Sequence, residues 1–322
     1  MIKISIIIPC YNVEQYIERC YHSLHNQFDA HNVEFIFVND GSTDNTLFIL
    51  QDIKSKDNRV VLINQKNAGV SVARNAALAI TKGEYTYLLD GDDYLTENAL
   101  LDIKQVLENY HPDVLISAYN ISMNNKELFK TLPFDEGLYQ KDVFFASIPF
   151  FPTTSQLVYR TDIIKDKNVS FNPSIKCGEV YDFTINYMQH IDNIYVLNKP
   201  TFNYFQRNDS ATHQPKLQND ITIINALNSI YQNGAELVNY GSFIVTAFKL
   251  MRCFSYTRYL KYSNDLKNIE LIENVLSDVI VKRCIKDTLI KPHKLIKERL
   301  IALYIYIMPK RFGFTLLNRL IK

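Results

Sequence analysis

The chain has 322 residues, of which 47% are hydrophobic, 12% aromatic and 21% charged. This length and composition predict a globular protein of about two domains, and they exclude a disordered tail, a collagen and a small disulfide scaffold. The formal net charge of +1 argues against a globally basic nucleic-acid binder. The charge is unevenly placed, because residues 281–322 carry a net charge of +9 and the rest of the chain is mildly acidic.

The cysteines suggest neither a disulfide framework nor a zinc site, because their number is odd and they lie far apart. They are Cys10, Cys20, Cys177, Cys253 and Cys284. We expect free thiols in a reducing cytosol. The apolar start of the chain is broken at Pro9, which favours a buried strand over a secretory signal. No stretch approaches the roughly 18 apolar residues of a membrane span.

The first 90 residues alternate between apolar strands and helices with one apolar face. Strands are predicted at 4–8, 33–38, 60–63 and 85–89. Asn12 is predicted to cap a first helix, Ser42 or Thr43 a second, and a third runs from about Val70 to Ile80. Such repeated units predict an α/β fold, a mostly parallel sheet with helices on both faces.

The rest of the chain divides into a mixed part and a helical part. Helices are predicted at 98–108 and 178–190, and strands at 114–118, 194–197 and 202–205. From about residue 217 only helical periodicity remains, after a polar stretch that reads as a linker. We therefore expect one domain over residues 1–215 and a helical C-terminal region over residues 216–322.

Polar residues follow each of the first four predicted strands. These clusters are Cys10–Asn12, Asn39–Asp40, Asn64–Asn67 and Asp90–Asp93. Ligands of parallel α/β sheets bind at the carboxyl ends of the strands, where these four loops converge. The sequence therefore predicts a site at this edge.

The turn Asp90-Gly91-Asp92-Asp93 is the most specific of these clusters. Three carboxylates within four residues repel one another unless a cation joins them, and oxygen ligands of this kind suit Mg²⁺ or Mn²⁺. A solvated acidic turn is the alternative interpretation. The chain contains no P-loop and no Gly-x-Gly-x-x-Gly fingerprint, so a P-loop NTPase and a Rossmann dehydrogenase both lose support.

Four motifs in this order and spacing resemble family 2 glycosyltransferases of the GT-A fold. They are IIIPCYN at 6–12, VNDGSTD at 38–44, NAG and ARN at 67–75, and LDGDD at 89–93. The resemblance is strong over residues 1–120 and continues more weakly to about 213. It implies a nucleotide-sugar-binding half over residues 1–100 and an acceptor half over residues 101–215. Residues 217–322 have no counterpart in it.

The resemblance implies transfer of a sugar from a nucleotide-sugar donor with inversion at the anomeric carbon. It places Pro9, Tyr11 and Asn12 as the wall of the base and ribose. It implies that Asp40 accepts a hydrogen bond from the base, usually uracil. Core packing is the alternative for Pro9 and Tyr11, and turn formation before Gly41 is the alternative for Asp40.

The same resemblance assigns the residues around the diphosphate. Asn67 and Arg74 would lie beside the ribose and diphosphate, and Asp90 would contact the ribose or the metal shell. Asp92 would bind Mn²⁺ or Mg²⁺, while Gly91 lets the backbone approach closely. A cation there would neutralise charge that develops on the leaving nucleotide. A plain turn former at Asn67 and a surface charge at Arg74 are the alternatives.

The catalytic base is where this sequence departs from the family pattern. Inversion needs a carboxylate to take the proton of the acceptor hydroxyl. Aligned on Phe183, the usual aspartate position holds Val180, which cannot accept a proton. Glu179 is our first candidate and Asp182 the second, since they share one face of the predicted helix.

The last features are a polar segment and the basic C-terminal end. Arg207 could pair with phosphate and His213 could be a further metal ligand, with a solvated linker as the alternative. The basic residues of 281–322 surround apolar segments, as in an element bound to an anionic membrane surface, or as in a solvated helical cap.

The sequence therefore predicts a metal-dependent, inverting glycosyltransferase, a hexosyltransferase type of transferase. It would move a sugar from a UDP-sugar to a hydroxyl of a glycan or lipid-linked glycan, in capsule, lipopolysaccharide or other surface polysaccharide biosynthesis. Because Val180 holds the base position, a catalytically silent nucleotide-sugar-binding subunit is the alternative. A nucleotidyltransferase is a third interpretation, because such an enzyme would use the same kind of sheet and metal. We expect a cytoplasmic location, free or peripheral at the inner face of the membrane, and no nucleic-acid partner.

Overall fold

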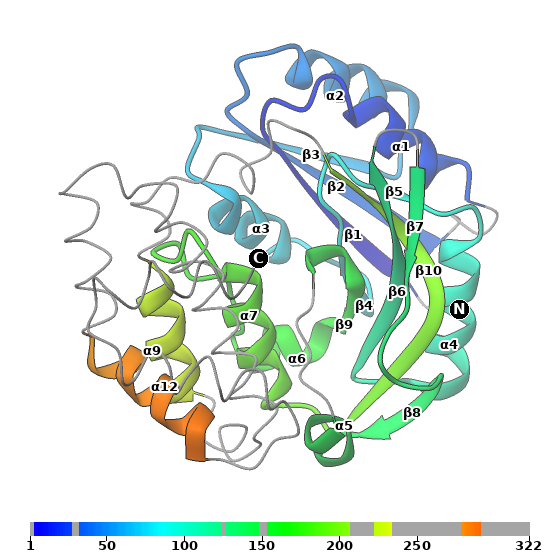
Figure 1. Cartoon of the computed structure of the whole chain (residues 1–322). Helices are drawn as coiled ribbons and strands as arrows, with labels where there is room; N and C mark the ends of the chain where they lie inside the picture. The colour runs from blue at the N-terminus through cyan, green and yellow to red at the C-terminus, as the bar shows by residue number, and fades with distance from the viewer. Residues whose placement is uncertain are drawn as a thin grey trace. The chain divides into compact units, whose positions relative to one another are not determined.

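The computed structural model describes residues 3–27, 32–123, 126–147, 153–206, 222–233 and 278–290. The chain forms two compact units (Figure 1). The first comprises residues 1–141, 152–173 and 190–210, and the second comprises residues 142–151, 174–189 and 211–322. Each unit is described below by itself.

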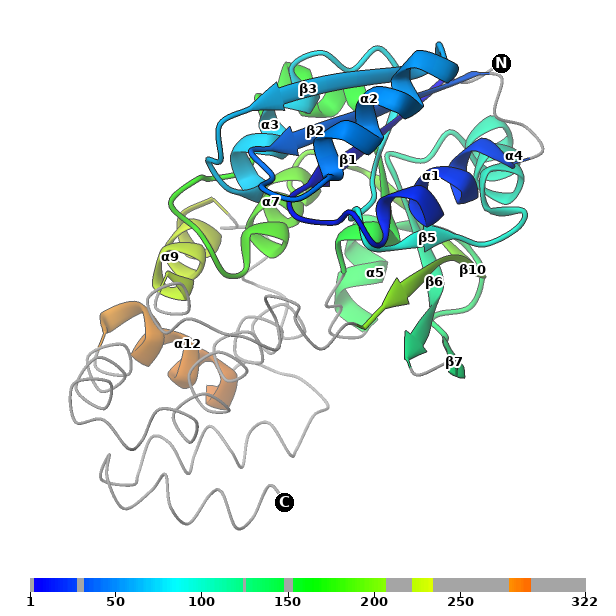
Figure 2. The same cartoon turned by 90° about the horizontal axis from the view of Figure 1, so that it is seen from above.

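Four parallel strands open the first unit, in the spatial order β3-β2-β1-β4. They are β1 (Ile4–Cys10), β2 (Val33–Asp40), β3 (Val60–Gln65) and β4 (Tyr85–Leu88). Figure 2 shows β1, β2 and β3 running side by side. Nearly every residue of β1, β2 and β4 is buried, as expected for strands covered on both faces. This half confirms the predicted parallel sheet.

The second half of the sheet adds antiparallel pairs. It consists of β5 (Tyr94–Leu95), β6 (Val114–Met123), β7 (Lys126–Lys130), β8 (Gly137–Gln140), β9 (Leu157–Arg160) and β10 (Asn193–Phe205). Strand β9 lies antiparallel between β4 and β6, whereas β10 runs parallel to β6. Two separate strands were expected where β10 is continuous. Its register shifts on both sides of Pro200, because proline has no N–H to donate to a ladder.

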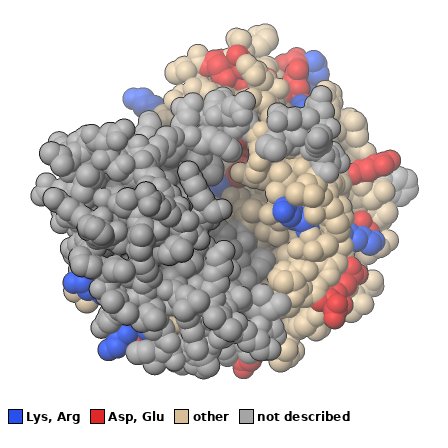
Figure 3. Space-filling model, in the orientation of Figure 1, with Lys and Arg blue, Asp and Glu red and all other residues tan. Residues whose placement is uncertain are grey.

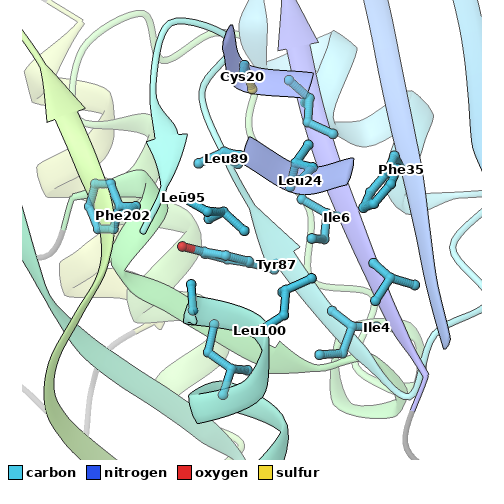
Figure 4. Close-up of a cluster of buried hydrophobic side chains, with 14 of the residues drawn as sticks. Ile4, Ile6, Cys20, Leu24, Phe35, Tyr87, Leu89, Leu95, Leu100 and Phe202 are labelled. Atoms are coloured by element: carbon cyan, nitrogen blue, oxygen red, sulfur yellow. The ribbon is translucent and has the colours of Figure 1, made fainter. Parts of the chain in front are cut away.

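The first-unit helices cover both faces of this sheet. Helices α1 (Ile17–His25), α2 (Thr46–Lys56) and α4 (Ala99–Tyr110) pack on the face that receives Ile4, Ile6 and Ile8. Helix α3 (Val70–Leu78) contacts β1 and β2 on the opposite face (Figure 1). Figure 4 shows how side chains from several of these elements meet in one cluster. Its labelled residues are Ile4, Ile6, Cys20, Leu24, Phe35, Tyr87, Leu89, Leu95, Leu100 and Phe202.

The first two helices begin later than the sequence predicts, so the expected caps are wrong. Helix α1 begins at Ile17, and Asn12 instead has a positive φ of 52° within the loop before it. Helix α2 begins at Thr46, after Asn45 rather than Ser42 or Thr43. Side chains of each loop bond to the other loop, which leaves both segments outside their helices.

The remaining first-unit elements are a 3₁₀ turn, η2 (Thr154–Gln156), and helix α6 (Thr161–Asp166), on either side of β9. On the face seen in Figure 3, charged side chains of the described residues lie scattered, some in small groups of both signs and some by themselves. Cys10, Cys20, Cys177 and Cys284 are free and buried, while Cys253 lies outside the described residues.

The second unit is helical where it is described. It contains most of α5 (Lys141–Ser147), together with α7 (Glu179–Met188), α9 (Ile223–Asn233) and α12 (Val279–Ile290). Helix α9 packs against both α7 and α12, and the Tyr231 hydroxyl donates to Asp287 at 3.1 Å. Within the described ranges, no helix combines the length and the hydrophobicity needed to cross a membrane.

Candidate active site

The carboxyl ends of the first four strands meet at one edge of the sheet. Cys10 at the end of β1 is in register with Asn39 of β2, which is in register with Asn64 of β3. The Asn39 amide donates to the Asn64 side chain at 2.7 Å. Leu89, just after β4, donates its N–H to the carbonyl of Ile7 at 3.0 Å. The four polar clusters of the sequence therefore lie together, as predicted from strand order.

Asp40 anchors the loop that follows β3. Its carboxylate is buried, and it accepts hydrogen bonds from Gln65 Nε2 at 2.8 Å and from the N–H groups of Ala68 and Gly69 at 2.9 Å. A carboxylate offers about four acceptor positions, so one position remains beyond these three hydrogen bonds. The resemblance assigned Asp40 to the base, and the structure adds that it shapes the loop beside this position.

Gly41 allows the two loops to approach closely. Its φ is +69°, and a Cβ there would lie 2.5 Å from the backbone nitrogen of Asn67. The Asn67 side chain donates to the Asp40 carbonyl at 2.9 Å. Asn67 is thus at the predicted edge, and its amide ties the loop after β3 to the end of β2.

The segment after β1 holds one exposed aromatic ring. Tyr11 is 48% exposed and Pro9 is half-buried, so both are accessible at this edge. The side-chain Oδ1 of Asn12 accepts a hydrogen bond from the N–H of Thr43 at 2.8 Å, which joins the β1 and β2 loops. Only Tyr11 of the three therefore presents a large flat apolar surface, and the contact of Asn12 with a base stays a prediction.

Arg74 of α3 is buried and pairs with Asp90. Its Nη2 donates to Asp90 Oδ1 at 2.8 Å and to Thr154 Oγ1 at 3.4 Å. The guanidinium lies over the ring of Phe171, at 5.1 Å from its centroid. The alternative of a solvated surface charge is wrong for Arg74, because its side chain is only 3% exposed.

The three carboxylates of the acidic turn have different environments. Asp93 is buried, and it accepts hydrogen bonds from Ser155 Oγ and from the N–H of Phe205, each at 3.0 Å. Burial, and then the charges of Asp90 and Asp92, raise the pKa of the Asp93 carboxyl well above its usual range. Asp93 therefore fixes the turn from inside, whereas Asp90 and Asp92 are half-buried at the edge.

Gly91 packs the turn against the end of β1. A Cβ on this residue would lie 3.0 Å from the Pro9 carbonyl oxygen and 3.4 Å from the Cys10 sulfur. Burial raises the pKa of the Cys10 thiol, and the charges of Asp92 and Asp90 raise it further. The negative charges of the turn thus act at the end of β1.

The chemistry of these side chains fits a hard divalent cation that takes most of its ligands from water and phosphate. Mg²⁺ typically takes one or two protein carboxylates and completes its shell with water and phosphate. Asp90 and Asp92 supply such carboxylates, although Asp90 is already paired with Arg74. Among the described residues, no group of three or more His, Cys, Asp or Glu side chains is arranged to hold a metal ion. Asp90 and Asp92 therefore suit a cation that is held jointly by these carboxylates and a bound phosphate.

The two candidate bases lie in the second unit, in the first turn of α7. Glu179 is half-buried and follows Gly178, which has a positive φ of 85°. Asp182 is buried on the same helix, and its Oδ1 has no hydrogen-bond partner among the described residues. Burial raises the pKa of the Asp182 carboxyl to about 6, although a hydrogen bond from Ser229 of α9 lowers it. The accessible carboxylate of the pair is Glu179.

Several predicted residues lie outside the described residues. These are Arg207 and His213, together with the basic residues beyond 290. Conversely, sequence reasoning missed the residues that hold the acidic turn from other elements, namely Arg19, Ser155 and Phe205, and it missed Thr154, which contacts Arg74. They lie between 62 and 112 residues from their partners, and no local motif marks them.

Comparison with solved structures defines the fold class. The crystal structure of Staphylococcus aureus TarS 1–349 in complex with UDP-GlcNAc matches with a TM-score of 0.74 and 22% identity, over 97% of this chain and 89% of that chain. Mannosyltransferase PcManGT from Pyrobaculum calidifontis, in complex with GDP-Man and Mn²⁺, matches with a TM-score of 0.55 and 11% identity, over 95% and 86%. The chain has the GT-A fold, as expected.

Comparison of sequences identifies the family. The model of glycosyl transferase family 2 matches residues 5–166, and the chain belongs to this family. It is 28% identical over 292 residues to the poly(ribitol-phosphate) beta-N-acetylglucosaminyltransferase TarS of Staphylococcus aureus, covering 87% of this chain and 49% of that protein. It is 34% identical over 191 residues to a poly(ribitol-phosphate) beta-glucosyltransferase of Bacillus spizizenii, covering 57% and 29%. The chain thus spans about half of the first relative and less than a third of the second.

Proposed function

We propose that this chain transfers a sugar from a UDP-sugar to a hydroxyl group of a surface polysaccharide, with inversion at the anomeric carbon. The observation that carries the proposal is the meeting of Tyr11, Asp40, Arg74 and the acidic turn at one edge of the parallel strands. Family membership and the names of the two relatives support the class of reaction.

The base and ribose would bind beside Tyr11 and Asp40. The exposed Tyr11 ring offers a stacking surface, which is favourable for a flat heterocycle. Asp40 keeps one acceptor position, which suits the N–H of a uracil ring. The crystal complex of TarS with UDP-GlcNAc supports a uridine donor.

The diphosphate would lie at the acidic turn, and Asp92, with Asp90, would hold Mn²⁺ or Mg²⁺ against it. The cation, when bound, would neutralise the negative charge that develops on the departing nucleotide. Arg74 neutralises Asp90 from the protein side, which reduces the repulsion between this carboxylate and the phosphates. The presence of Mn²⁺ in the mannosyltransferase complex supports metal use.

In the transfer step, an acceptor oxygen forms a bond to the anomeric carbon as the bond from that carbon to the diphosphate oxygen breaks. The electron pair of the broken bond stays on UDP. Glu179 would take the proton of the acceptor hydroxyl, since its side chain is only half-buried at the start of α7. Asp182 is a poorer candidate because it is buried.

The acceptor would be a hydroxyl-rich polymer, as the names of both relatives suggest. Three exposed basic side chains of α12, Lys282, Arg283 and Lys286, would attract a polyanionic polymer or an anionic membrane surface. The proposal includes peripheral attachment of the chain to a membrane surface.

Metal-dependent UDP release from a panel of donors tests the proposal, with Glu179→Gln, Asp182→Asn and Glu108→Gln compared with the wild type. Glu108 is a matched control, because it is an exposed glutamate on α4. Removing a general base typically lowers kcat by about 10²- to 10⁴-fold, and we expect this loss for Glu179→Gln with little change in donor affinity.

Each other outcome is informative. Wild-type activity in Glu179→Gln, with loss in Asp182→Asn, would move the base to Asp182. Donor binding without turnover for any acceptor would favour the catalytically silent subunit, which the valine at position 180 suggests. Turnover that is unchanged by a chelator would refute the metal dependence.

A further inference from the structure

Arg19 of α1 lies between aromatic rings next to the acidic turn. Its guanidinium carbon is 4.1 Å from the centroid of the Phe205 ring and 4.4 Å from that of Tyr94. The Tyr16 ring is 5.9 Å away and tilts against Phe205. Such contacts between a planar cation and aromatic faces are attractive and restrict the orientation of the guanidinium.

The same guanidinium is bonded to the main chain of the turn. Arg19 Nη2 donates to the carbonyl oxygen of Asp92 at 3.0 Å. One of the rings that contact Arg19 belongs to Phe205, whose own N–H donates to Asp93 at 3.0 Å. Arg19 therefore connects α1, the acidic turn and the end of β10, three elements that are far apart in the sequence.

This arrangement requires an arginine and is not optimised for stability alone. Arg19 Nε is buried and has no hydrogen-bond acceptor among the described residues, which is unfavourable for a folded chain. A lysine would keep the charge but lose the planar group that stacks on two rings and bonds sideways to a carbonyl. The planar guanidinium of Arg19 is therefore suited to holding the acidic turn.

We propose that Arg19 is a positioning residue that holds the main chain of Asp92 in the orientation that binds the cation. This inference rests on the proposed metal dependence. It also assigns a role to the end of β10, because Phe205 restrains Arg19 and leads into the segment that contains Arg207 and His213. Groups that orient a metal ligand typically alter metal affinity by about 10- to 100-fold when they are replaced.

The test measures Mn²⁺ binding to the complex of the full chain with UDP, by calorimetry and by the electron paramagnetic resonance of free Mn²⁺. The variants are Arg19→Met, Arg19→Lys and the control Arg59→Met. Arg59 also lies over an aromatic ring, Phe35 at 4.9 Å, and it contacts the end of α1 through His25, while its guanidinium donates hydrogen bonds to Asp57.

We expect Arg19→Met to raise the Mn²⁺ dissociation constant about 10- to 100-fold, with Arg19→Lys in between. The dissociation constant of UDP without metal should change less than about twofold, since Arg19 bonds to the acidic turn, whereas the uracil base is proposed to bind beside Tyr11 and Asp40. Excess Mn²⁺ should restore turnover of Arg19→Met. The Arg59→Met control should lower the Tm and leave Mn²⁺ affinity unchanged.

Two results would overturn the inference in distinguishable ways. Wild-type Mn²⁺ affinity in Arg19→Met, with a Tm as low as that of the Arg59→Met control, would mean that Arg19 only stabilises the fold. Absence of Mn²⁺ binding by the wild-type complex with UDP would refute the proposed metal dependence, and this inference with it.

Discussion

Replacing Asp182 with asparagine is expected to remove a loss of stability that the wild type undergoes as pH rises to neutrality. Asp182 is buried, and burial raises the pKa of its carboxyl from 3.8 to about 6. Well below its ordinary pKa of 3.8, this carboxyl is protonated in both the folded and the unfolded state. As pH rises through 6 the folded chain must hold a buried charge, so the wild type loses stability that the variant keeps.

The size of the effect follows from the shift. About two pKa units, at about 1.4 kcal/mol each, correspond to about 2–3 kcal/mol of stability lost between pH 4 and pH 7.5. Urea unfolding of the wild type and Asp182→Asn at both pH values measures this change. The constant difference between the two side chains cancels, because only the change with pH is compared.

Asp57→Asn provides a comparison with the opposite sign. Arg59 donates hydrogen bonds to Asp57 and holds the pKa of that carboxyl well below its usual range. Its contribution to stability is therefore present above about pH 4 and is lost as pH falls. A pH-independent difference between Asp182→Asn and the wild type, or a difference with the sign of Asp57→Asn, would refute the reasoning for Asp182.

Two further predictions concern the site. A double-mutant cycle of urea unfolding with Arg74→Met and Asp90→Asn should give a coupling free energy of about 1–2 kcal/mol for this ion pair. The reason is that Arg74 is buried and Asp90 is one-third exposed. Additive effects of the two substitutions would contradict this prediction. Gly41→Ala should destabilise the chain by about 2 kcal/mol or more and weaken UDP binding, because it combines a positive φ with a backbone clash. Gly137→Ala, which also has a positive φ but has no atom within 4 Å of the new Cβ, should be milder and should leave UDP binding unchanged.

The local pattern of the sequence predicts much of the first 120 residues correctly. Apolar strands covered on both faces can be recognised without knowing their neighbours, because burial on both faces demands continuous apolar runs. The order of strands and helices then brings Asp40 and the acidic turn to one edge, as the right-handed connection between parallel strands requires. The position of the site is therefore determined by the sequence pattern itself.

The roles of individual polar residues depend on partners that local patterns do not reveal. Asn12 is a good helix cap by type, yet its side chain bonds to Thr43 of another loop, and the helix begins at Ile17. Spacing places Glu179 and Asp182 on one face of the helix, but only packing against α9 shows that Asp182 is buried.

The acidic turn shows most clearly what tertiary structure alone decides. Its sequence contains three equivalent carboxylates, but Ser155 and Phe205 draw Asp93 inward and Arg74 pairs with Asp90. These partners lie between 16 and 112 residues away along the chain and belong to other elements. Burial and ion pairing are determined by which segments pack together. The sequence therefore determines the type of each residue, whereas its protonation and accessibility depend on the folded structure.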